Sequence, residues 1–552
     1  MARNPDPAGQ DRPWSRWYAE RRLGPLAAHP DLVTMAAAAA RSAPDRLALT
    51  YHGWTATHAE LARLSDGFAA YLASRGVRRG DRVAVCLQTS PHFVVAALGA
   101  WKVGAILVTM NPMYREGEVA HLLGDSGAVA VVSSQQGYRT VVAPVLAGTV
   151  VRVSVTTSEV DVIDDPDPRV FAGLTDEAVE GTDDLMTVAR GHADDGFPAY
   201  QPAPGDVAVL CYTSGTTGPA KGAMLTHANI ATTIALNSQW LGTQPGWVIY
   251  GTAPLFHVVG LVLQVAHALH LAGTLVLPYR TIPEVMLEHL VEYRPRFVVC
   301  PPTVYTALMA VPSATPEAFA SLDLLYAGGA VLPPAVVERF LERFGKYVNN
   351  GYGLTETAGA CVFAVPGRRA RMDEASQALS NGVPLPGMDV RIVGDDGQDL
   401  PIGERGEIVV KGPCVTPGYW QNPNETANAI HDGWFATGDI GFIDDEGMLY
   451  CVDRKKDMIV ASGFKVWPGE VEQVLLTHPA VMEAAVVGMP DAYRGESVKA
   501  FVIPRPGSQV SPEELAAWCK ARLATFKAPR EVQVVADLPR TASGKVLKRE
   551  LR

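Results

Sequence analysis

Helix-like and strand-like segments alternate along most of the chain, and this alternation limits the fold more than any other feature of the sequence. Residues 57–76 place apolar side chains at spacings of three and four, which predicts a helix, and residues 82–88 follow as a short β-rich run. A further helix–strand pair spans residues 91–109, and residues 128–134 predict another strand. This order is typical of βαβ units on a largely parallel sheet, so we expect an α/β fold.

The remaining segments predict how this α/β fold is divided. Residues 295–309 and 324–345 each predict a strand, a turn marked by Pro or Gly, and a helix, whereas residues 136–200 are irregular and acidic and predict a surface excursion. After about residue 385, short strands separated by Asp-Gly and Gly-Glu turns predict a small antiparallel or β-barrel subdomain. From about residue 456 onward, the pattern predicts a compact α+β unit.

We therefore expect two domains in the chain of 552 residues, which is too long for one ordinary core. The first, residues 1–455, is a large N-terminal body of two parallel-type α/β subdomains plus a small β-barrel-like subdomain. The second, residues 456–552, is a smaller, mobile α+β C-terminal domain.

Composition excludes several classes of protein. An apolar content of 48% with 19% charged residues is that of a soluble globular protein, and the formal charge of −11 argues against a nucleic-acid partner. The seven cysteines are scattered without a CxxC pair, which fits a reducing compartment and gives no sign of structural zinc. The first twenty residues lack the apolar region of a secretory signal, so we expect a cytoplasmic protein.

Two apolar stretches resemble membrane spans but contain polar residues at their centres. Residues 93–110 include Lys102, and residues 258–278 include Gln264, His267 and His270. Because a spanning helix needs about 20 mostly apolar residues, we interpret both stretches as buried α/β elements and expect no transmembrane segment.

The stretch "YTSGTTGPAKG", residues 212–222, has the composition of an anion-binding loop. Its glycines let backbone N–H groups face an anion, its hydroxyl groups add donors, and Lys221 supplies positive charge. It differs from the Walker loop because Ala220 precedes the lysine and Gly222, rather than Ser or Thr, follows it. Taken alone, the stretch is also compatible with a flexible surface loop.

Other stretches carry residues suited to the remaining parts of a nucleotide. Tyr352 lies between two glycines and can stack on a planar base, and Glu356 follows closely as an oxygen ligand for Mg²⁺. Asp439 follows a Thr-Gly turn and can accept hydrogen bonds from a ribose diol. Arg454 lies in a basic run, and Lys545 follows a glycine near the C-terminus.

Together and in this order, these stretches resemble the adenylate-forming superfamily, which contains acyl- and aryl-CoA synthetases, nonribosomal adenylation domains and firefly-type luciferases. The resemblance extends from about residue 45 to the C-terminus. Residues 111–132, 254–260 and 495–504 are most similar to fatty-acyl-CoA ligases.

The resemblance implies an ATP site whose phosphate loop contains Thr213, Ser214, Gly215, Thr216, Thr217, Gly218 and Lys221. It implies that Tyr352 covers one face of adenine and that the other face meets three small residues, Gly328, Gly329 and Ala330. Thr355 is expected to contact the α-phosphate and Glu356 to bind Mg²⁺. Asp439 and Arg454 are expected to hold the ribose hydroxyls.

The resemblance also implies roles in catalysis and in the coenzyme A step. Lys545 matches the lysine that bridges the substrate carboxylate and ATP, and Lys456 matches the hinge of the C-terminal domain. Gly463 is expected to leave room for pantetheine, with Lys465 near phosphate. His257 corresponds to the residue that gates the acyl pocket.

Two positions depart from the usual family pattern. The phosphate loop usually has Pro immediately before its lysine, whereas Pro219 is followed here by Ala220, which implies a somewhat less rigid loop. The hinge position is Lys456 where many relatives have Asp, and both residue types suit an exposed pivot.

These roles imply an ATP- and Mg²⁺-dependent carboxylic acid:CoA ligase that forms an acyl-adenylate and then an acyl-CoA thioester. The apolar stretches 257–269 and 301–308 favour a hydrophobic acid, first a medium- or long-chain fatty acid and second an aryl or alicyclic acid. Three alternatives stay open: an enzyme that loads a carrier protein, a nucleotide-binding scaffold without ligase activity, and a luciferase-type oxygenase. A homodimer is compatible with the sequence.

Overall fold

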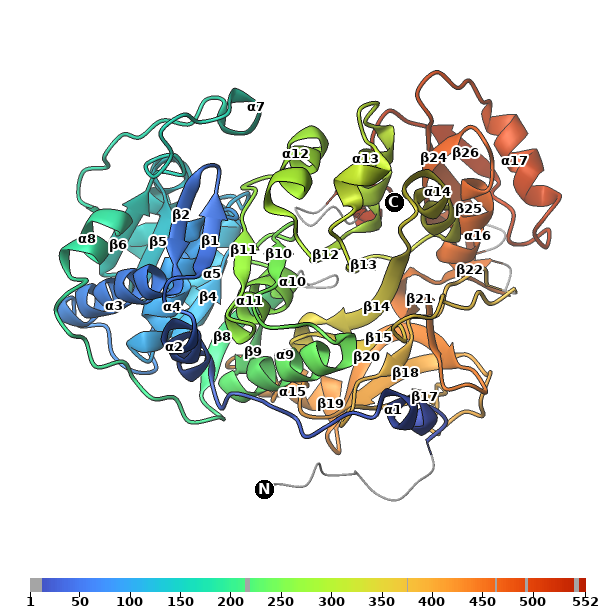
Figure 1. Cartoon of the computed structure of the whole chain (residues 1–552). Coiled ribbons are helices and arrows are strands. Elements are labelled where there is room, and N and C mark those ends of the chain that lie inside the picture. The colour runs from blue at the N-terminus through green and yellow to red at the C-terminus, as the bar shows by residue number, and fades with distance from the viewer. Residues whose placement is uncertain (1–11, 214–218, 375, 462–463, 492–494, 541–545) are drawn as a thin grey trace.

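The computed structural model describes residues 12–213, 219–374, 376–461, 464–491, 495–540 and 546–552. Two large sheets form most of the N-terminal body, a small antiparallel sheet follows, and a separate α+β unit ends the chain (Figure 1). This arrangement confirms the expected α/β class with a smaller C-terminal unit.

The first large sheet has seven strands and is parallel except at the edge where β8 pairs with β9. Its order is β7 (Asp183–Asp184), β6 (Val153–Thr157), β5 (Ala130–Ser134), β3 (Arg82–Cys86), β4 (Ile106–Thr109), β8 (Val207–Thr213) and β9 (Lys221–Thr226). The helices that accompany it are α3 (His58–Ser74), α4 (Pro91–Lys102), α5 (Glu116–Ser126) and α8 (Leu185–Gly191). Strands β6 and β7 and helix α8 come from residues 136–200, so the predicted surface excursion is wrong for these parts.

The second large sheet has nine strands, with a parallel centre and antiparallel pairs at both edges. Its order is β16 (Val383–Pro384), β15 (Gly359–Phe363), β14 (Val348–Leu354), β13 (Leu324–Ala327), β12 (Phe297–Cys300), β10 (Val248–Tyr250), β11 (Thr274–Val276), β1 (Leu47–Tyr51) and β2 (Trp54–Thr57). The main helices around it are α2 (Leu32–Ser42), α9 (His227–Leu241), α12 (Pro283–Tyr293), α13 (Pro302–Ala310) and α14 (Pro334–Phe344).

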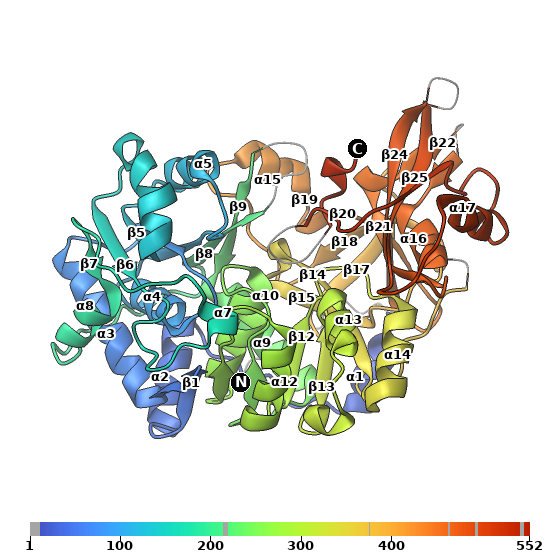
Figure 2. The same ribbon diagram turned by 90° about the horizontal axis from the view of Figure 1, so that it is seen from above.

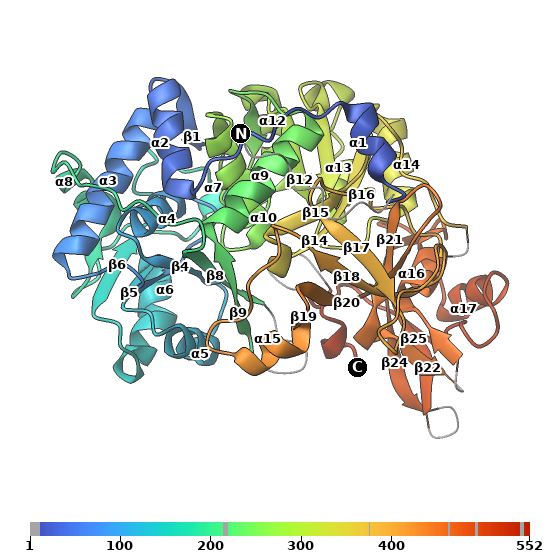
Figure 3. The same ribbon diagram turned by 90° about the horizontal axis from the view of Figure 1, so that it is seen from below.

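A small antiparallel sheet lies next to the edge of the nine-stranded sheet that carries β14 and β15, as Figure 3 shows from below. Its strands are β17 (Asp389–Val393), β18 (Gly406–Lys411), β19 (Ile430–His431), β20 (Trp434–Ile443) and β21 (Leu449–Arg454). The short helix α15 (Pro423–Ala429) precedes β19. The last strand, β21, leads directly into the C-terminal unit.

The C-terminal unit has its own five-stranded sheet and its own buried core. Its elements are β22 (Ile459–Ala461), β23 (Phe464–Val466), α16 (Pro468–Leu476), β24 (Val481–Asp491), β25 (Gly495–Pro504), α17 (Pro512–Lys520) and β26 (Glu531–Val534). Helix α16 lies beside β21 in two perpendicular views (Figures 1 and 2).

The two apolar stretches that resemble membrane spans are buried elements, as expected. Residues 93–110 form most of α4 and then β4, and residues 258–278 form α10 (Val258–Gly260), a π-helical segment η3 (Leu261–Ala266), α11 (His267–His270) and β11. Within the described part of the chain, no helix combines the length and apolar character that crossing a membrane requires.

Candidate active site

The carboxylate of Asp439 joins two other predicted site residues, although the three lie on separate strands. The Tyr352 hydroxyl on β14 donates to Asp439 Oδ2 at 2.9 Å, and Arg454 Nε on β21 lies 3.1 Å from Asp439 Oδ1. The antiparallel register of β20 and β21 places Asp439 directly opposite Arg454. The structure therefore brings these three residues together where the small sheet meets the nine-stranded sheet.

Local backbone geometry directs these side chains. Gly353 adjoins a bulge in the β14–β15 pairing, and a Cβ at this position would lie 2.0 Å from the carbonyl oxygen of Gly359. Only glycine fits so close an approach, so the residue after Tyr352 cannot carry a side chain. Gly438 has a φ of +70°, a left-handed conformation that turns the chain immediately before Asp439.

Tyr352 and Asp439 are nearly buried, and this burial affects the protonation of the tyrosine and of the neighbouring Arg454. Tyr352 is 7% exposed and Asp439 is 3% exposed. Burial and the nearby carboxylate raise the pKa of the Tyr352 hydroxyl well above its usual range, so the hydroxyl stays a donor. Burial lowers the pKa of Arg454, but Asp439 and the neighbouring Tyr352, Cys451 and Asp457 together outweigh this and raise it, so the guanidinium stays charged. The resulting cluster offers both acceptors and a cation to a ligand.

Glu356 lies in the short 3₁₀ turn η5 (Thr355–Thr357), between β14 and β15. The Tyr419 hydroxyl donates to Glu356 Oε1 at 2.9 Å, and the backbone N–H of Thr416 donates to the Glu356 carbonyl at 2.7 Å. Burial raises the pKa of the Glu356 carboxyl, and the hydrogen bond from Tyr419 opposes this rise. The loop that precedes α15 thus fixes both the backbone and the side chain of Glu356.

A carboxylate in this setting fits a magnesium ion. Mg²⁺ prefers oxygen ligands and commonly takes one or two protein carboxylates together with substrate phosphates and water. No group of three or more metal-binding side chains occurs within the described residues. Glu356 is therefore suited to share such an ion with a phosphate rather than to form part of a closed protein site.

Lys221 begins β9, directly opposite Thr213 at the end of β8. Its ammonium group pairs with the Glu425 carboxylate of α15 and lies 5.7 Å from the centre of the Tyr419 ring. Tyr419 therefore contacts both Glu356 and the lysine of the predicted phosphate loop. Sequence analysis missed Tyr419 and Glu425; the only signal for the former was an aromatic residue after Gly418 in the stretch "PGYW".

The structure also describes five other predicted residues of the N-terminal body: Gly328, Gly329, Ala330, His257 and Thr355. The segment Gly328–Ala330 follows the carboxyl end of β13, whose neighbour in the sheet is β14 with Tyr352. Ligands in open α/β sheets commonly bind outside the carboxyl ends of strands, which agrees with this placement. His257 precedes α10, and its Nδ1 accepts from the Val259 backbone at 3.4 Å. Thr355 is the first residue of η5 and directly precedes Glu356.

The predicted C-terminal residues are only partly described. Lys456 is an exposed residue of η6 (Lys455–Asp457), the turn that connects β21 to β22. The backbone of Lys465 belongs to β23 and pairs with Val460 of β22. The other predicted positions on the loops lie outside the described residues: Ser214, Gly215, Thr216, Thr217, Gly218, Gly463 and Lys545.

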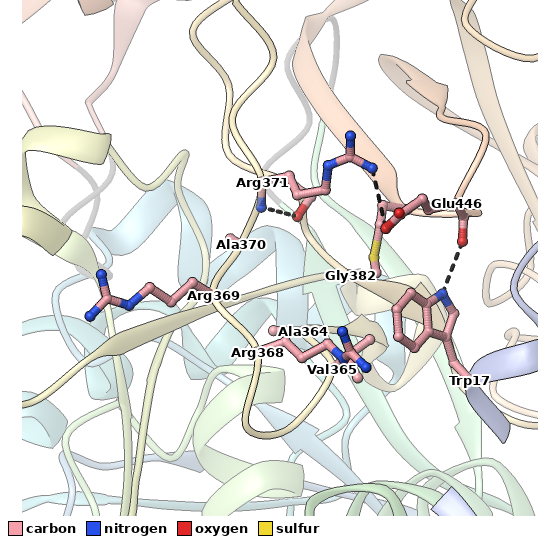
Figure 4. A pocket seen from close by; sticks show the side chains of 11 residues that line it. Trp17, Ala364, Val365, Arg368, Arg369, Ala370, Arg371, Gly382 and Glu446 are labelled. Carbon is pink, nitrogen blue, oxygen red and sulfur yellow. Dashed lines mark hydrogen bonds and ion pairs between the residues drawn. The ribbon is translucent and has the colours of Figure 1, made fainter. Parts of the chain in front are cut away.

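A pocket of about 280 Å³ lies elsewhere and shares no residue with this site. Figure 4 shows its arginines, of which Arg371 lies 3.2 Å from the Glu446 carboxylate. Arg368 lies 3.1 Å from Glu20 and 4.8 Å from the Trp17 ring. Because carboxylates match Arg368 and Arg371, and Arg369 lies over the Tyr347 ring instead, we assign no ligand to this pocket.

Sequence comparison agrees with the geometry of the site. Residues 36–420 match the AMP-binding enzyme family, and residues 470–545 match the AMP-binding enzyme C-terminal domain. The chain therefore belongs to the AMP-binding enzyme family. This confirms the predicted adenylate-forming superfamily and the predicted class of enzyme, an AMP-forming acid–CoA ligase.

Individual relatives cover almost the whole chain. It is 36% identical over 517 residues to a feruloyl-CoA synthase of an Amycolatopsis species, covering 93% of this chain and 96% of the relative. It is 33% identical over 521 residues to a long-chain-fatty-acid–CoA ligase of Bacillus subtilis strain 168, covering 92% and 91%.

One solved relative is known in two states. ATP-bound MatB from Rhodopseudomonas palustris matches with a TM-score of 0.82 at 29% identity, covering 94% of this chain and 98% of MatB. Apo MatB matches with a TM-score of 0.74 at 29% identity, covering 95% and 98%. By TM-score, the structure is therefore more similar to ATP-bound MatB than to apo MatB.

The contacts of Asp439 with Tyr352 and Arg454, here called the Asp439 cluster, lead to a prediction about nucleotide binding. We expect Asp439→Asn to weaken ATP binding by about 10- to 100-fold, because hydrogen bonds to charged groups contribute about 1.5–3 kcal/mol. Isothermal titration calorimetry at fixed magnesium and salt measures the change in Kd.

Asp389→Asn is the matched control for this substitution. Asp389 lies on the same small sheet and pairs with Arg12, so this substitution removes an Asp–Arg ion pair but does not affect Tyr352. An Asp439→Asn protein that binds ATP with the wild-type Kd would show that this cluster does not contact the nucleotide.

Proposed function

We propose that the enzyme activates a hydrophobic monocarboxylic acid, with a medium- or long-chain fatty acid as the first candidate. The observation that carries this proposal is the apolar segment formed by α10 and η3. Residues 258–266 contain no charged side chain and all but Val259 are buried. The segment packs against the chain just beyond Glu356, since a Cβ on Gly359 would lie 3.8 Å from Leu263 and 3.9 Å from Val262.

The polar group of this segment is already engaged. Gln264 is buried, and its amide faces Thr252 and the carbonyl of Val299. A second carboxylate or a ring hydroxyl on the substrate would therefore find no available partner in residues 258–266. An aryl acid is the second candidate, because the feruloyl-CoA synthase is as similar to this chain as the fatty-acid ligases are.

The two chemical steps require the charges that this site contains. In the first, the substrate carboxylate attacks the α-phosphorus of ATP, and pyrophosphate leaves as the acyl-adenylate forms. Because two anions must approach each other, catalysis depends on cancelling charge and holding the reactants in line. Lys221, Thr355 and the Lys545 ammonium group would serve these purposes, and Mg²⁺ held by Glu356 would neutralise phosphate charge.

The second step is attack of the coenzyme A thiolate on the carbonyl of the adenylate. For this step the C-terminal domain, residues 456–552, would rotate relative to the N-terminal body, residues 1–455, with Lys456 as the pivot. In the arrangement described here, Val460 and Phe464 of the β22–β23 hairpin are 41% and 55% exposed. The hairpin that carries Lys465 is therefore not covered by the N-terminal body, which fits an arrangement for adenylation rather than for thioester formation.

The substrate proposal is tested by CoA-dependent AMP release over acids from acetate to palmitate, together with benzoate and ferulate. We expect the highest kcat/KM with an aliphatic acid, because each methylene group that the substrate buries against an apolar wall contributes about 0.8 kcal/mol to binding. If kcat/KM is highest with ferulate, the substrate is an aryl acid rather than a fatty acid. Acid-dependent pyrophosphate exchange that CoA leaves unchanged would indicate a carrier protein as acceptor.

The assignment of Lys545 is tested by separating the two steps. We expect Lys545→Ala to lower acid-dependent pyrophosphate exchange by about 10²–10³, as losses of preorganised charges do in other enzymes. Thioester formation from supplied acyl-adenylate should stay within a few-fold of wild type. Equal losses in both assays would contradict a role confined to adenylation.

A further inference from the structure

Charged side chains attach the last residues of the chain to the segment around the proposed pivot. Lys548 Nζ lies 2.8 Å from Glu472 Oε1 on α16, and Arg552 lies 3.3 Å from Asp457 of η6. Glu472 Oε1 also accepts from the backbone N–H of Val486 at 2.7 Å, which fixes it within the C-terminal unit. In the sequence, Lys548 follows Lys545 by three positions.

Asp453 extends this network across the boundary between the two proposed domains. It lies near the end of β21 and is 8% exposed. Its Oδ2 accepts from the backbone N–H of Gly469, at the start of α16, at 2.7 Å. The first N–H groups of a helix have no partner within the helix, so a carboxylate at this place satisfies one and interacts favourably with the helix dipole.

The approach of α16 to β21 is close. A Cβ on Gly469 would lie 3.1 Å from the Val452 carbonyl oxygen and 3.4 Å from Asp453 Oδ2. The residue that precedes the helix, Trp467, provides no side-chain cap. The cap therefore comes from the N-terminal body, and it exists only while α16 stays against β21.

Lys548 pairs with Glu472 and also lies near enough to Asp453 to influence its charge. Burial lowers the pKa of Lys548, but Glu472 and Asp453 outweigh this and raise it, so the lysine stays charged. Burial raises the pKa of Asp453 to about 6, with Lys548 opposing the rise and Glu472 adding to it. The ionised Asp453 carboxylate is thus less stable here at neutral pH than in water, which favours a contact that can be released.

The members of this network belong to different sides of the pivot. Lys455 is held by Glu407 of β18 at 2.8 Å and so stays with the N-terminal body, as Asp453 does. Gly469, Glu472 and Lys548 belong to the C-terminal unit. Rotation about Lys456 would therefore separate Asp453 from the N–H of Gly469 and from Lys548, while the Lys548–Glu472 pair would persist.

We propose that Asp453 is a positioning residue that holds the C-terminal domain in its adenylation arrangement, by capping α16 and facing the Lys548–Glu472 pair three residues after Lys545. The contact must open before the thioester step. The inference rests on the proposed two-arrangement function, and it assigns to Asp453 and Lys548 a role in the balance between the two steps.

The test compares two substitutions at the boundary with a matched one inside the C-terminal unit. Asp453→Ala removes the cap on α16, and Lys548→Met removes the positive charge beside Asp453 together with the pair to Glu472. Lys527→Met is the control, because Lys527 pairs with Glu470 of the same helix at 2.6 Å and is 22% exposed, against 19% for Lys548, without reaching β21. Lys548→Arg keeps the charge and tests rescue.

We expect Asp453→Ala and Lys548→Met to lower acid-dependent pyrophosphate exchange at least tenfold. Thioester formation from supplied acyl-adenylate should be unchanged or faster, because the adenylation arrangement no longer competes with it. Lys527→Met should leave the ratio of the two rates at its wild-type value, and Lys548→Arg should restore most of the exchange. Equal loss of both rates, or the same shift in Lys527→Met, would overturn the proposal.

A second measurement needs no substrate. Limited proteolysis with trypsin after Lys455 and Lys456 should be several-fold faster in Asp453→Ala and Lys548→Met than in wild type and in Lys527→Met. Unchanged cleavage would contradict the positioning role even where the rates shift. A wild-type enzyme that shows no exchange with any acid would instead contradict the proposed function, while the proteolysis result would still decide the role of Asp453.

Discussion

The arrangement of the site depends on the two contacts of the Asp439 carboxylate. This carboxylate receives a hydrogen bond from Tyr352 of the nine-stranded sheet and pairs with Arg454 of the neighbouring strand in the small sheet. Two distinct sheets are thereby joined at one almost fully buried carboxylate. A buried carboxylate is stable only when its oxygens have partners, so the sheets must keep this register for the charge to be tolerated.

Much of the fold follows from local pattern, and the exceptions have a common cause. The strand Arg82–Cys86 and the helix Pro91–Lys102 were predictable because apolar periodicity is strong there. The strand Val153–Thr157 was not, since it lies within an acidic and irregular segment of about sixty residues. Its place in the sheet is fixed by pairing with Ala130–Ser134, a contact between distant segments that periodicity does not encode.

The same distinction applies to the site. Tyr352, Asp439 and Arg454 could be proposed together because each lies in a recognisable stretch, and the structure shows that they are in contact. Tyr419 and Asp453 were missed because a tyrosine after a glycine, or an aspartate at the end of a strand, has many ordinary explanations. Their importance appears only with their partners, the Glu356 carboxylate and the N–H of Gly469.

The contacts around the nucleotide site and those around the pivot differ in a way that suits their tasks. Tyr352, Asp439 and Arg454 all belong to strands of the N-terminal body, so rotation of the C-terminal unit leaves them together. The contact between Asp453 and α16 crosses the proposed pivot, and burial raises the pKa of the Asp453 carboxyl to about 6. In the proposed function, a site that binds ATP before each turnover needs fixed partners, whereas a domain that moves between two steps needs a contact weak enough to break. Under the proposed rotation, two aspartates within fifteen residues of each other thus meet opposite requirements, because Asp439 is paired within the N-terminal body and Asp453 is shared with the C-terminal unit.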